Sequence, residues 1–224
     1  MFSRSISILG KENIEKLNRT HIVLCGCGGV GSYTFEALVR TGVGKITVID
    51  SDTVDISNLN RQIIATMDTI GAQKVEVAKL RAISINPEIE IIPVYKHLTA
   101  DNIDEILPKD ADYIVDAIDF VPAKIALALY SQKTGIPIIC CLGTGKRIDA
   151  TKFEICDIFQ TSGCPLARKM RYELKKAGIT SLTVLFSKAK VIETKGIGSV
   201  AFVPSVAGLL IAQKVICDIT GEKI

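Results

Sequence analysis

The stretch that decides the fold runs from His21 to Gly31 and reads HIVLCGCGGVG. A short β-branched, apolar run ends in Gly26, Gly28 and Gly31, which satisfy the spacing G-x-G-x-x-G, and an apolar-periodic segment, 30–41, follows at once. This order predicts a strand, a tight turn and a helix, because glycine permits the turn and lets a ligand approach the backbone. The helix N-terminus adds unpaired N–H groups that suit a phosphate. Alone, the motif is also compatible with a strand–helix turn that binds nothing.

Strands and helices alternate on both sides of this turn. The patterns predict strands at 45–50, 89–95, 113–117, 137–142, 153–158 and 182–186. They predict helices at 7–18, 72–85, 101–107, 122–134 and 166–177, then a short segment at 201–203 and a last helix from 205 to about 218. Alternation of this kind indicates an α/β fold: a Rossmann-like, doubly wound, mostly parallel sheet with helices on both faces. We expect the C-terminal part to extend the sheet in antiparallel fashion.

The composition fits an ordinary folded protein. The chain has 224 residues, 48% of them hydrophobic and 23% charged, with a formal net charge of +3. The length fits one domain over 1–224. The seven cysteines show no framework spacing, which favours reduced thiols. The N-terminus has no apolar run suited to a signal peptide, and the most apolar helical stretch, 206–216, is short for a membrane span. We therefore expect a cytoplasmic protein without a membrane.

Polar residues after the next strand identify the ligand more closely. Asp50 ends the second strand about 20 residues beyond the turn, where a carboxylate accepts hydrogen bonds from ribose hydroxyls. The following loop contains Arg61 and two asparagine amides, and Lys74 lies near the start of a helix. Two cations and several amides suit a triphosphate better than the pyrophosphate of a dinucleotide. Asp119 follows the strand at 113–117 and could hold Mg²⁺ against the phosphates. Individually, these charges also fit a solvated surface or a helix cap.

Together these residues resemble the ubiquitin-activating-enzyme superfamily of ThiF/MoeB-type adenylating enzymes. The matching motifs are Gly26-x-Gly28-Gly29-Val30-Gly31-Ser32, Asp50-x-Asp52, Asn58-Leu59-Asn60-Arg61-Gln62, Lys74 and Asp116-x-x-Asp119. Further motifs are similar to one branch, the tRNA threonylcarbamoyladenosine dehydratases: Phe2-Ser3-Arg4, Gly10-Lys11-Glu12, Pro165-Leu166-Ala167 and the run from Phe202 to Gly208. With these motifs the resemblance spans nearly the whole chain. It implies a single ATP-binding adenylating domain over 1–224, with a nucleotide-binding half at 1–142 and a substrate and dimerisation half at 143–224.

The resemblance implies an ATP-dependent cyclisation of N6-threonylcarbamoyladenosine in tRNA. The threonyl carboxylate is adenylated, and an internal nucleophile of the modified base then displaces AMP. It implies Arg61, Lys74 and Asp119 as catalytic residues, with Asp119 also binding Mg²⁺. The implied ATP-binding set is Arg4, Gly26, Gly28, Gly29, Gly31, Asp50, Asp52, Ser57, Asn58, Asn60, Arg61 and Lys74. Arg4 matches an arginine that family dimers lend to the neighbouring subunit, which implies a homodimer.

The chain also departs from the wider superfamily. It has no CxxC zinc pairs, and the segment 182–203 contains no cysteine for a thioester or persulfide relay. That segment is short for the dehydratase branch, and Cys164 stands where an acidic residue is expected before Pro165. Adenylation of the C-terminus of a ubiquitin-like sulfur-carrier protein stays an alternative, with a carrier or sulfur-donor partner. A catalytically inactive nucleotide sensor is another, against which the intact charged set argues.

A third alternative is a nicotinamide-dependent dehydrogenase. Tyr172 and Lys176 match the Tyr-x-x-x-Lys pair of short-chain dehydrogenases, but they fall in a helix crowded with basic residues, which favours a solvated face. The same basic residues offer a surface for tRNA phosphates. The basic residues of this helix are Arg168, Lys169, Arg171, Lys175 and Lys176, and the further basic residues that could face the tRNA are Lys146, Arg147, Lys188, Lys190 and Lys195.

Overall fold

One seven-stranded sheet forms the centre of the protein in this computed structural model, which describes residues 1–196 and 198–223. The strand order is β3-β2-β1-β4-β5-β7-β6, and neighbours are parallel except for β6 and β7, which are antiparallel. The predicted doubly wound sheet with an antiparallel C-terminal extension is confirmed. The strands are β1 (His21–Cys25), β2 (Lys45–Ile49), β3 (Glu90–Val94), β4 (Tyr113–Asp116), β5 (Ile138–Cys141), β6 (Phe153–Asp157) and β7 (Thr183–Ser187).

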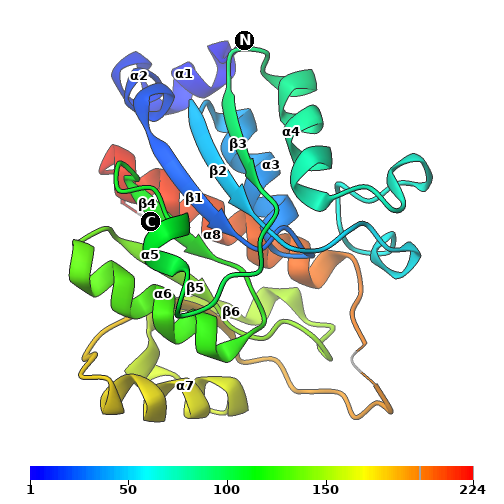
Figure 1. The fold of residues 1–224 in the computed structure, drawn as a ribbon, viewed down its shortest axis with the longest axis vertical. Helices are drawn as coiled ribbons and strands as arrows, with labels where there is room; N and C mark the ends of the chain where they lie inside the picture. The colour runs from blue at the N-terminus through cyan, green and yellow to red at the C-terminus, as the bar shows by residue number, and fades with distance from the viewer. Residues whose placement is uncertain (197, 224) are drawn as a thin grey trace.

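The register of the central strands brings their carboxyl ends to one level. Cys25 at the end of β1 pairs with Ile49 of β2 and with Asp116 of β4. Asp116 in turn pairs with Cys140 of β5. All five residues of β1 are buried, as expected for a parallel strand that is covered on both faces. The loops that leave β1, β2, β4 and β5 therefore start side by side, at the edge to which the arrowheads of β1 and β2 point in Figure 1.

Helices pack on both faces of the sheet. Helices α3, α4 and α8 pack with one another in one layer, and α5, α6 and α7 pack in the other (Figure 1). The α-helices are α1 (Ser3–Leu9), α2 (Lys11–Arg19), α3 (Gly31–Thr41), α4 (Lys74–Ile85), α5 (Ile103–Ile106), α6 (Val121–Thr134), α7 (Pro165–Lys176) and α8 (Phe202–Thr220). Short 3-10 helices are η1 (Ile56–Asn58), η2 (Met67–Thr69), η3 (Ala150–Lys152) and η4 (Ile158–Gln160).

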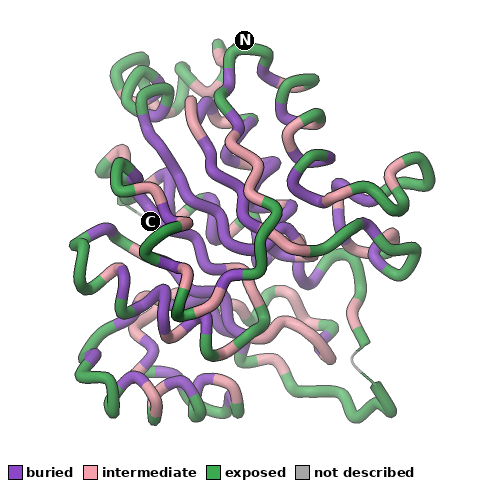
Figure 2. The backbone as a smooth tube through the Cα atoms, viewed as in Figure 1, coloured by how far each residue is buried: buried purple, intermediate pink, exposed green. Residues whose placement is uncertain are grey.

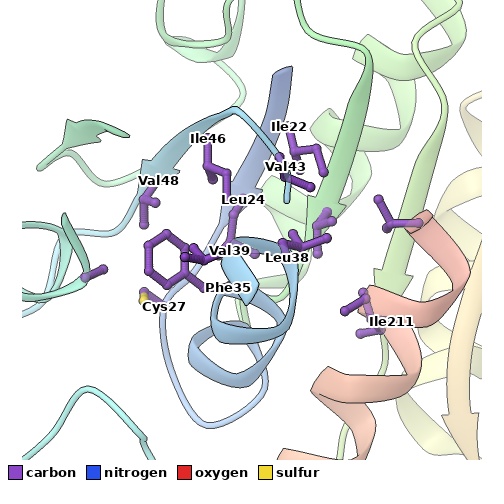
Figure 3. Close-up of a cluster of buried hydrophobic side chains, with 14 of the residues drawn as sticks. Ile22, Leu24, Cys27, Phe35, Leu38, Val39, Val43, Ile46, Val48 and Ile211 are labelled. Atoms are coloured by element: carbon purple, nitrogen blue, oxygen red, sulfur yellow. The ribbon is translucent and has the colours of Figure 1, made fainter. Parts of the chain in front are cut away.

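The largest hydrophobic cluster fixes the helix that follows the glycine turn. Figure 3 shows Phe35, Leu38 and Val39 of α3 between β1, β2 and Ile211 of α8. Helix α8 can approach α3 closely because residue 208 is glycine: a Cβ there would lie 2.4 Å from the carbonyl oxygen of Val30. The contact with α8 thus fixes the start of α3 and, with it, the glycine turn that precedes this helix.

Two predicted boundaries are wrong. The single helix expected at 7–18 is two helices, α1 and α2, separated by Gly10, whose φ of 82° interrupts the helical backbone. The last helix begins at Phe202 rather than at 205, so residues 202 and 203 of the short segment expected at 201–203 already belong to it. Extended coil precedes it, and most of 188–196 and 198–202 is exposed (Figure 2).

Helix α8 is also longer than the apolar stretch expected at 206–216. With 19 residues and a mean hydropathy of 1.6, it is long and apolar enough to cross a membrane by length and composition. Its buried face, however, packs on α3, α2 and β5 as part of the largest core cluster. It is therefore a core helix of a soluble protein.

Candidate active site

A cavity of about 500 Å³ opens where the central strands end. Its walls come from the glycine turn and from the loops that follow β2, β3, β4 and β5, with Pro204 of α8 closing one side. Most of the predicted site residues line it: Gly26, Gly28, Gly29, Asp50, Asp52, Asn58, Arg61, Lys74 and Asp119. The chain thus brings together, at one sheet edge, residues that lie up to 93 positions apart (Gly26 to Asp119).

The glycine turn is dictated by backbone contacts. Gly26 has a φ of +89°, and a Cβ there would lie 2.8 Å from the carbonyl oxygen of Ala117. A Cβ on Gly31 would lie 1.9 Å from the carbonyl oxygen of Gly26. Gly28 differs, because its first neighbour would be Nε2 of Gln62 at 3.9 Å. Gly26 and Gly31 are therefore required by the fold, whereas Gly28 keeps the space above the turn clear for a ligand.

Asp50 is held rigidly at the rim of the turn. Its Oδ2 accepts a hydrogen bond from the backbone N–H of Cys27 at 2.6 Å, and its Oδ1 accepts one from that of Asp52 at 2.8 Å. Each carboxylate oxygen still has a lone pair for a further donor. The carboxylate is therefore in place to accept hydrogen bonds from ribose hydroxyls.

Lys74 is a buried cation with an exposed partner. Its Nζ lies 2.7 Å from Oδ2 of Asp52, and Lys74 is only 4% exposed while the Asp52 side chain is 65% exposed. An incoming phosphate can compete for this ammonium, because Asp52 can turn to solvent when it is replaced. The pair thus keeps Lys74 neutralised until an anion enters the cavity.

The guanidinium of Arg61 forms hydrogen bonds within its own loop. Its Nη1 donates to the carbonyl oxygen of Ser57 at 2.7 Å and to Oδ1 of Asn60 at 2.9 Å. Nδ2 of Asn60 donates in turn to the carbonyl oxygen of Ser199, which ties this loop to the segment before α8. Asn58 is buried and its Oδ1 accepts the N–H of Asp55, so it also caps η1. Ser57 and Asn60 lie outside the cavity wall and reach the site through Arg61.

Asp119 is exposed in the loop after β4 and lines the same cavity as Arg61. Within residues 1–196 and 198–223, no three His, Cys, Asp or Glu side chains gather as a metal site. Mg²⁺ bound with a nucleotide needs only one or two carboxylates, because phosphate oxygens and water supply the rest. A single exposed carboxylate at this position fits such an ion.

A buried ion pair beneath the cavity was missed by sequence reasoning. Nζ of Lys124, on α6, lies 3.0 Å from both carboxylate oxygens of Asp116 and donates to the carbonyl oxygen of Cys141 at 2.7 Å. The two side chains are 1% and 0% exposed. Burial alone would lower the pKa of Lys124, but the Asp116 carboxylate outweighs it and holds that pKa above its ordinary range. The available signal was a lysine among the apolar residues of the helix at 122–134.

Asp116 also orders the loop that carries Asp119. Its Oδ1 accepts the N–H of Ile118 at 3.2 Å. At the outer rim, the rings of His97 and Phe120 lie with centroids 5.5 Å apart, a pair that the motifs did not indicate. Together with nearby Leu98 and Ile118, these rings form an apolar wall of the kind that suits a nucleobase.

The cysteines of the site are unsuited to nucleophilic chemistry. Cys25, Cys27, Cys140 and Cys141 are buried, and burial raises the pKa of each thiol, that of Cys141 to about 12. A thiol above its ordinary pKa is almost fully protonated near pH 7, and the thiolate is the nucleophile. Cys164 is buried too, and its Sγ accepts the N–H of Ala167 as the N-cap of α7.

Two predicted groups lie away from this cavity. Arg4, on α1, borders a separate hollow of about 670 Å³ together with Arg40 and Arg81. Tyr172 is 66% exposed on α7 and does not line the cavity. Helices α1 and α7 lie at opposite ends of the molecule in Figure 1. The Tyr172 and Lys176 pair is thus part of a solvated face, as the basic surroundings suggested.

A doubly wound sheet with a carboxylate, two cations and a glycine turn around one cavity at the carboxyl ends of its strands is the arrangement of a Rossmann-like nucleotide-binding enzyme. The family model described as "ThiF family" matches residues 2–223, and the chain belongs to this family. A tRNA threonylcarbamoyladenosine dehydratase of Bacillus subtilis is 38% identical over an alignment that covers 97% of this chain and 94% of the relative. The dehydratase of Escherichia coli is 40% identical over 78% of this chain and 65% of its own length.

Solved structures give the same picture. The structure of E. coli tRNA N6-threonylcarbamoyladenosine dehydratase in complex with AMP has a TM-score of 0.95 at 33% identity, covering 99% of this chain and 94% of that one. The same enzyme in complex with ATP has a TM-score of 0.90, covering 100% and 96%.

Proposed function

We propose that this protein is an ATP-dependent tRNA threonylcarbamoyladenosine dehydratase, which cyclises N6-threonylcarbamoyladenosine in tRNA through an adenylated carboxylate. The observation that carries the proposal is the single cavity that holds Asp50, Arg61, Lys74 and Asp119 around the glycine turn. Its support is the similarity, over 97% of the chain, to a relative with that activity in its name.

The first step is adenylation. An oxygen of the threonyl carboxylate attacks the α-phosphorus of ATP, and pyrophosphate leaves. Arg61 and Lys74 supply positive charge where negative charge builds up on the phosphates, and this preorganised charge lowers the barrier. Lys74 is desolvated before the ligand arrives, so exchanging Asp52 for a phosphate oxygen requires little reorganisation. Mg²⁺, held by Asp119 and the phosphates, would neutralise further charge.

The second step closes the ring. An internal nucleophile of the modified base attacks the acyl carbon and expels AMP, which carries away one of the two carboxylate oxygens. The net result is loss of one water from the substrate with ATP cleaved to AMP and pyrophosphate. No protein nucleophile is needed, which agrees with the protonated, buried thiols around the cavity. Positioning is the main contribution of the chain.

The remaining assignments belong to the same proposal. Asp50 binds the ribose, the glycine turn faces the phosphates, and Asn58, Ser57 and Asn60 hold Arg61's loop. Arg4 does not line the cavity of its own chain. In a homodimer it contacts the ATP bound in the cavity of the neighbouring subunit. The compartment is the cytoplasm.

The substrate tRNA binds through basic residues near the open side of the cavity. Lys146 lies next to Gly145, which lines the cavity, and Lys188, Lys190 and Lys195 belong to the exposed segment before α8. Contacts between lysines and phosphates predict a dissociation constant that rises steeply with salt. A salt-independent affinity would contradict this surface.

The experiment uses purified protein, ATP–Mg²⁺ and tRNA that carries N6-threonylcarbamoyladenosine. We expect nucleoside mass spectrometry to show a product lighter by one water, together with one AMP per product. Cells without the protein should accumulate the open nucleoside. Adenylation stimulated by a ubiquitin-like carrier protein, and not by the modified tRNA, would instead establish the sulfur-carrier alternative.

A further inference from the structure

Arg147 is a buried cation behind one wall of the cavity. It is only 7% exposed, so the expectation that it faces tRNA phosphates is wrong. Its Nη1 donates to the carbonyl oxygens of Gly143 at 2.9 Å and of Gly145 at 3.1 Å. Within residues 1–196 and 198–223 the guanidinium forms no ion pair, and its buried Nε has no hydrogen-bond partner. Because a buried charge without a counter-ion is costly to the fold, its retention here points to a role in the cavity.

The two carbonyl groups belong to the loop that follows β5. The cavity wall includes three residues of this loop, Gly143, Thr144 and Gly145. The far end of the loop is fixed as well, because the N–H of Lys146 donates to the carbonyl oxygen of Gly198 at 2.8 Å. Lys146 has a φ of 57°, in the left-handed region. A residue other than glycine keeps this conformation only where its surroundings impose it, so the loop is held in one shape.

The anchored carbonyl of Gly143 sets the direction of the next N–H. The peptide bonds of the described residues are trans, and in a trans peptide the C=O and the N–H point in opposite directions. The carbonyl points to Arg147, which does not line the cavity, so the N–H of Thr144 points to the cavity side. Within the described part of the chain this N–H has no hydrogen-bond partner. The guanidinium also polarises the peptide, which strengthens its N–H as a donor.

The strand order places this donor on the other side of the glycine turn from Asp50. Asp50 follows β2, the turn follows β1 and Thr144 follows β5, and the sheet order is β2-β1-β4-β5. With the ribose at Asp50 and the phosphates at the turn, an acyl group on the α-phosphate extends toward β4 and β5. Its carbonyl carbon therefore lies on the side of the cavity that Gly143 and Thr144 line.

We propose that the N–H of Thr144 is a donor of an oxyanion hole for ring closure, and that Arg147 is the residue that positions it. The inference rests on the proposed function, since it takes the acyl adenylate as the occupant of the cavity. The internal nucleophile forms a bond to the acyl carbon, and the π electrons of the C=O move to its oxygen. When the C=O forms again, the C–O bond to AMP breaks, AMP leaves with that electron pair, and the proton of the nucleophile passes to water. The oxygen is an anion only between these two events, so a donor directed at it lowers the barrier to ring closure.

Two arginines with similar hydrogen bonds allow a matched comparison. Arg147→Met removes the donors to the two loop carbonyls and keeps an apolar stem. Arg171→Met is the control, because Nη1 of Arg171 also donates to two backbone carbonyls, those of Thr161 at 3.0 Å and Ile158 at 3.5 Å. Arg171 lies on α7 and does not line the cavity. Arg147→Lys keeps a positively charged donor for the loop and is the conservative variant.

The experiment follows a single turnover of the intact protein with ATP–Mg²⁺ and modified tRNA. Pyrophosphate release measures adenylation, and mass spectrometry of the cyclic nucleoside measures ring closure. We expect Arg147→Met to slow ring closure about tenfold or more, because the donor is no longer held in place, and to change the rate of adenylation less than about twofold. Arg147→Lys should restore most of the rate of ring closure. Arg171→Met should leave the ratio of the two rates unchanged, even where it lowers the melting temperature.

An amide-to-ester replacement tests the donor itself, because it exchanges only the N–H of Thr144 for an oxygen atom. We expect it to slow ring closure about 100-fold, as for loss of one oxyanion-hole donor. Equal slowing of both steps by Arg147→Met would overturn the inference, as would unchanged ring closure in the folded ester variant. If the unsubstituted protein formed no cyclic nucleoside from ATP and modified tRNA, the proposed function would fail, which is a distinguishable result.

Discussion

Replacing Lys124 by methionine should strongly destabilise the protein. Methionine fills much the same volume, but Asp116 would keep one hydrogen bond, from Ile118 at 3.2 Å, in place of three contacts. Asp116 is fully buried, so its charge would be uncompensated. Breaking such a pair costs about 3–5 kcal/mol. With a urea m-value of about 2–3 kcal/mol/M, the unfolding midpoint should fall by about 1–2.5 M.

Lys133→Met is the matched control on the same helix. Lys133 pairs with Asp104 at 2.9 Å, but both side chains are about two-thirds exposed, at 67% and 64%. Water screens such a pair, so its loss should scarcely move the midpoint. The double variant Lys124→Met/Asp116→Asn should be more stable than Lys124→Met alone, because no buried charge is left. Equal midpoints for Lys124→Met and Lys133→Met in urea would refute this reasoning.

Three further predictions concern the site and the sheet. Arg61→Ala should lower the rate of AMP release about 100-fold, as for loss of one charge-stabilising group. The melting temperature should change little, because the hydrogen bonds of Arg61 are exposed. Full turnover by this variant would remove Arg61 from the mechanism. Gly31→Ala should fold poorly, since its Cβ would lie 1.9 Å from a backbone oxygen, whereas Gly196→Ala meets no atom within 4 Å and should behave like the unsubstituted protein in circular dichroism. Burial lowers the pKa of His21 despite Asp110 nearby, so the folded state favours the neutral ring. The contribution of the neutral His21 ring to the free energy of unfolding should be fully present above about pH 6.5. It should be lost as the pH falls toward the folded-state pKa of His21. Unfolding free energies at several pH values should show this slope, and His21→Gln should flatten it.

The sheet and the turn could be predicted because their signals are local. Three glycines directly after an apolar run permit few backbone conformations, and the strands alternate regularly with helices. Polar residues directly after strands, such as Asp50 and Asp119, must meet at one edge once the strands are parallel. The boundary errors at Gly10 and Phe202 have local causes too. An isolated glycine within a helical pattern can be a break, and a proline in the first turn does not prevent a helix from starting earlier.

The missed features depend on contacts across the fold. Lys124 and Asp116 are eight residues apart, but they pair only because α6 packs over the end of β4. The bond from Asn60 to Ser199 spans 139 positions, and no pattern in either segment indicates it. Oε1 of Gln62 is buried without a hydrogen-bond partner among residues 1–196 and 198–223, and the sequence pattern does not indicate this either. Burial and pairing of polar groups are tertiary properties, whereas periodicity is local.

The central claim is that the threonyl carboxylate becomes bonded to AMP before the ring closes. Its most direct test uses modified tRNA whose threonyl carboxylate carries ¹⁸O in both oxygens, with purified protein and ATP–Mg²⁺. Mass spectrometry of the released AMP should then show one ¹⁸O atom per cyclised product, because the leaving group takes a carboxylate oxygen with it. Unlabelled AMP, with the ¹⁸O found in inorganic phosphate or water, would contradict an adenylated intermediate.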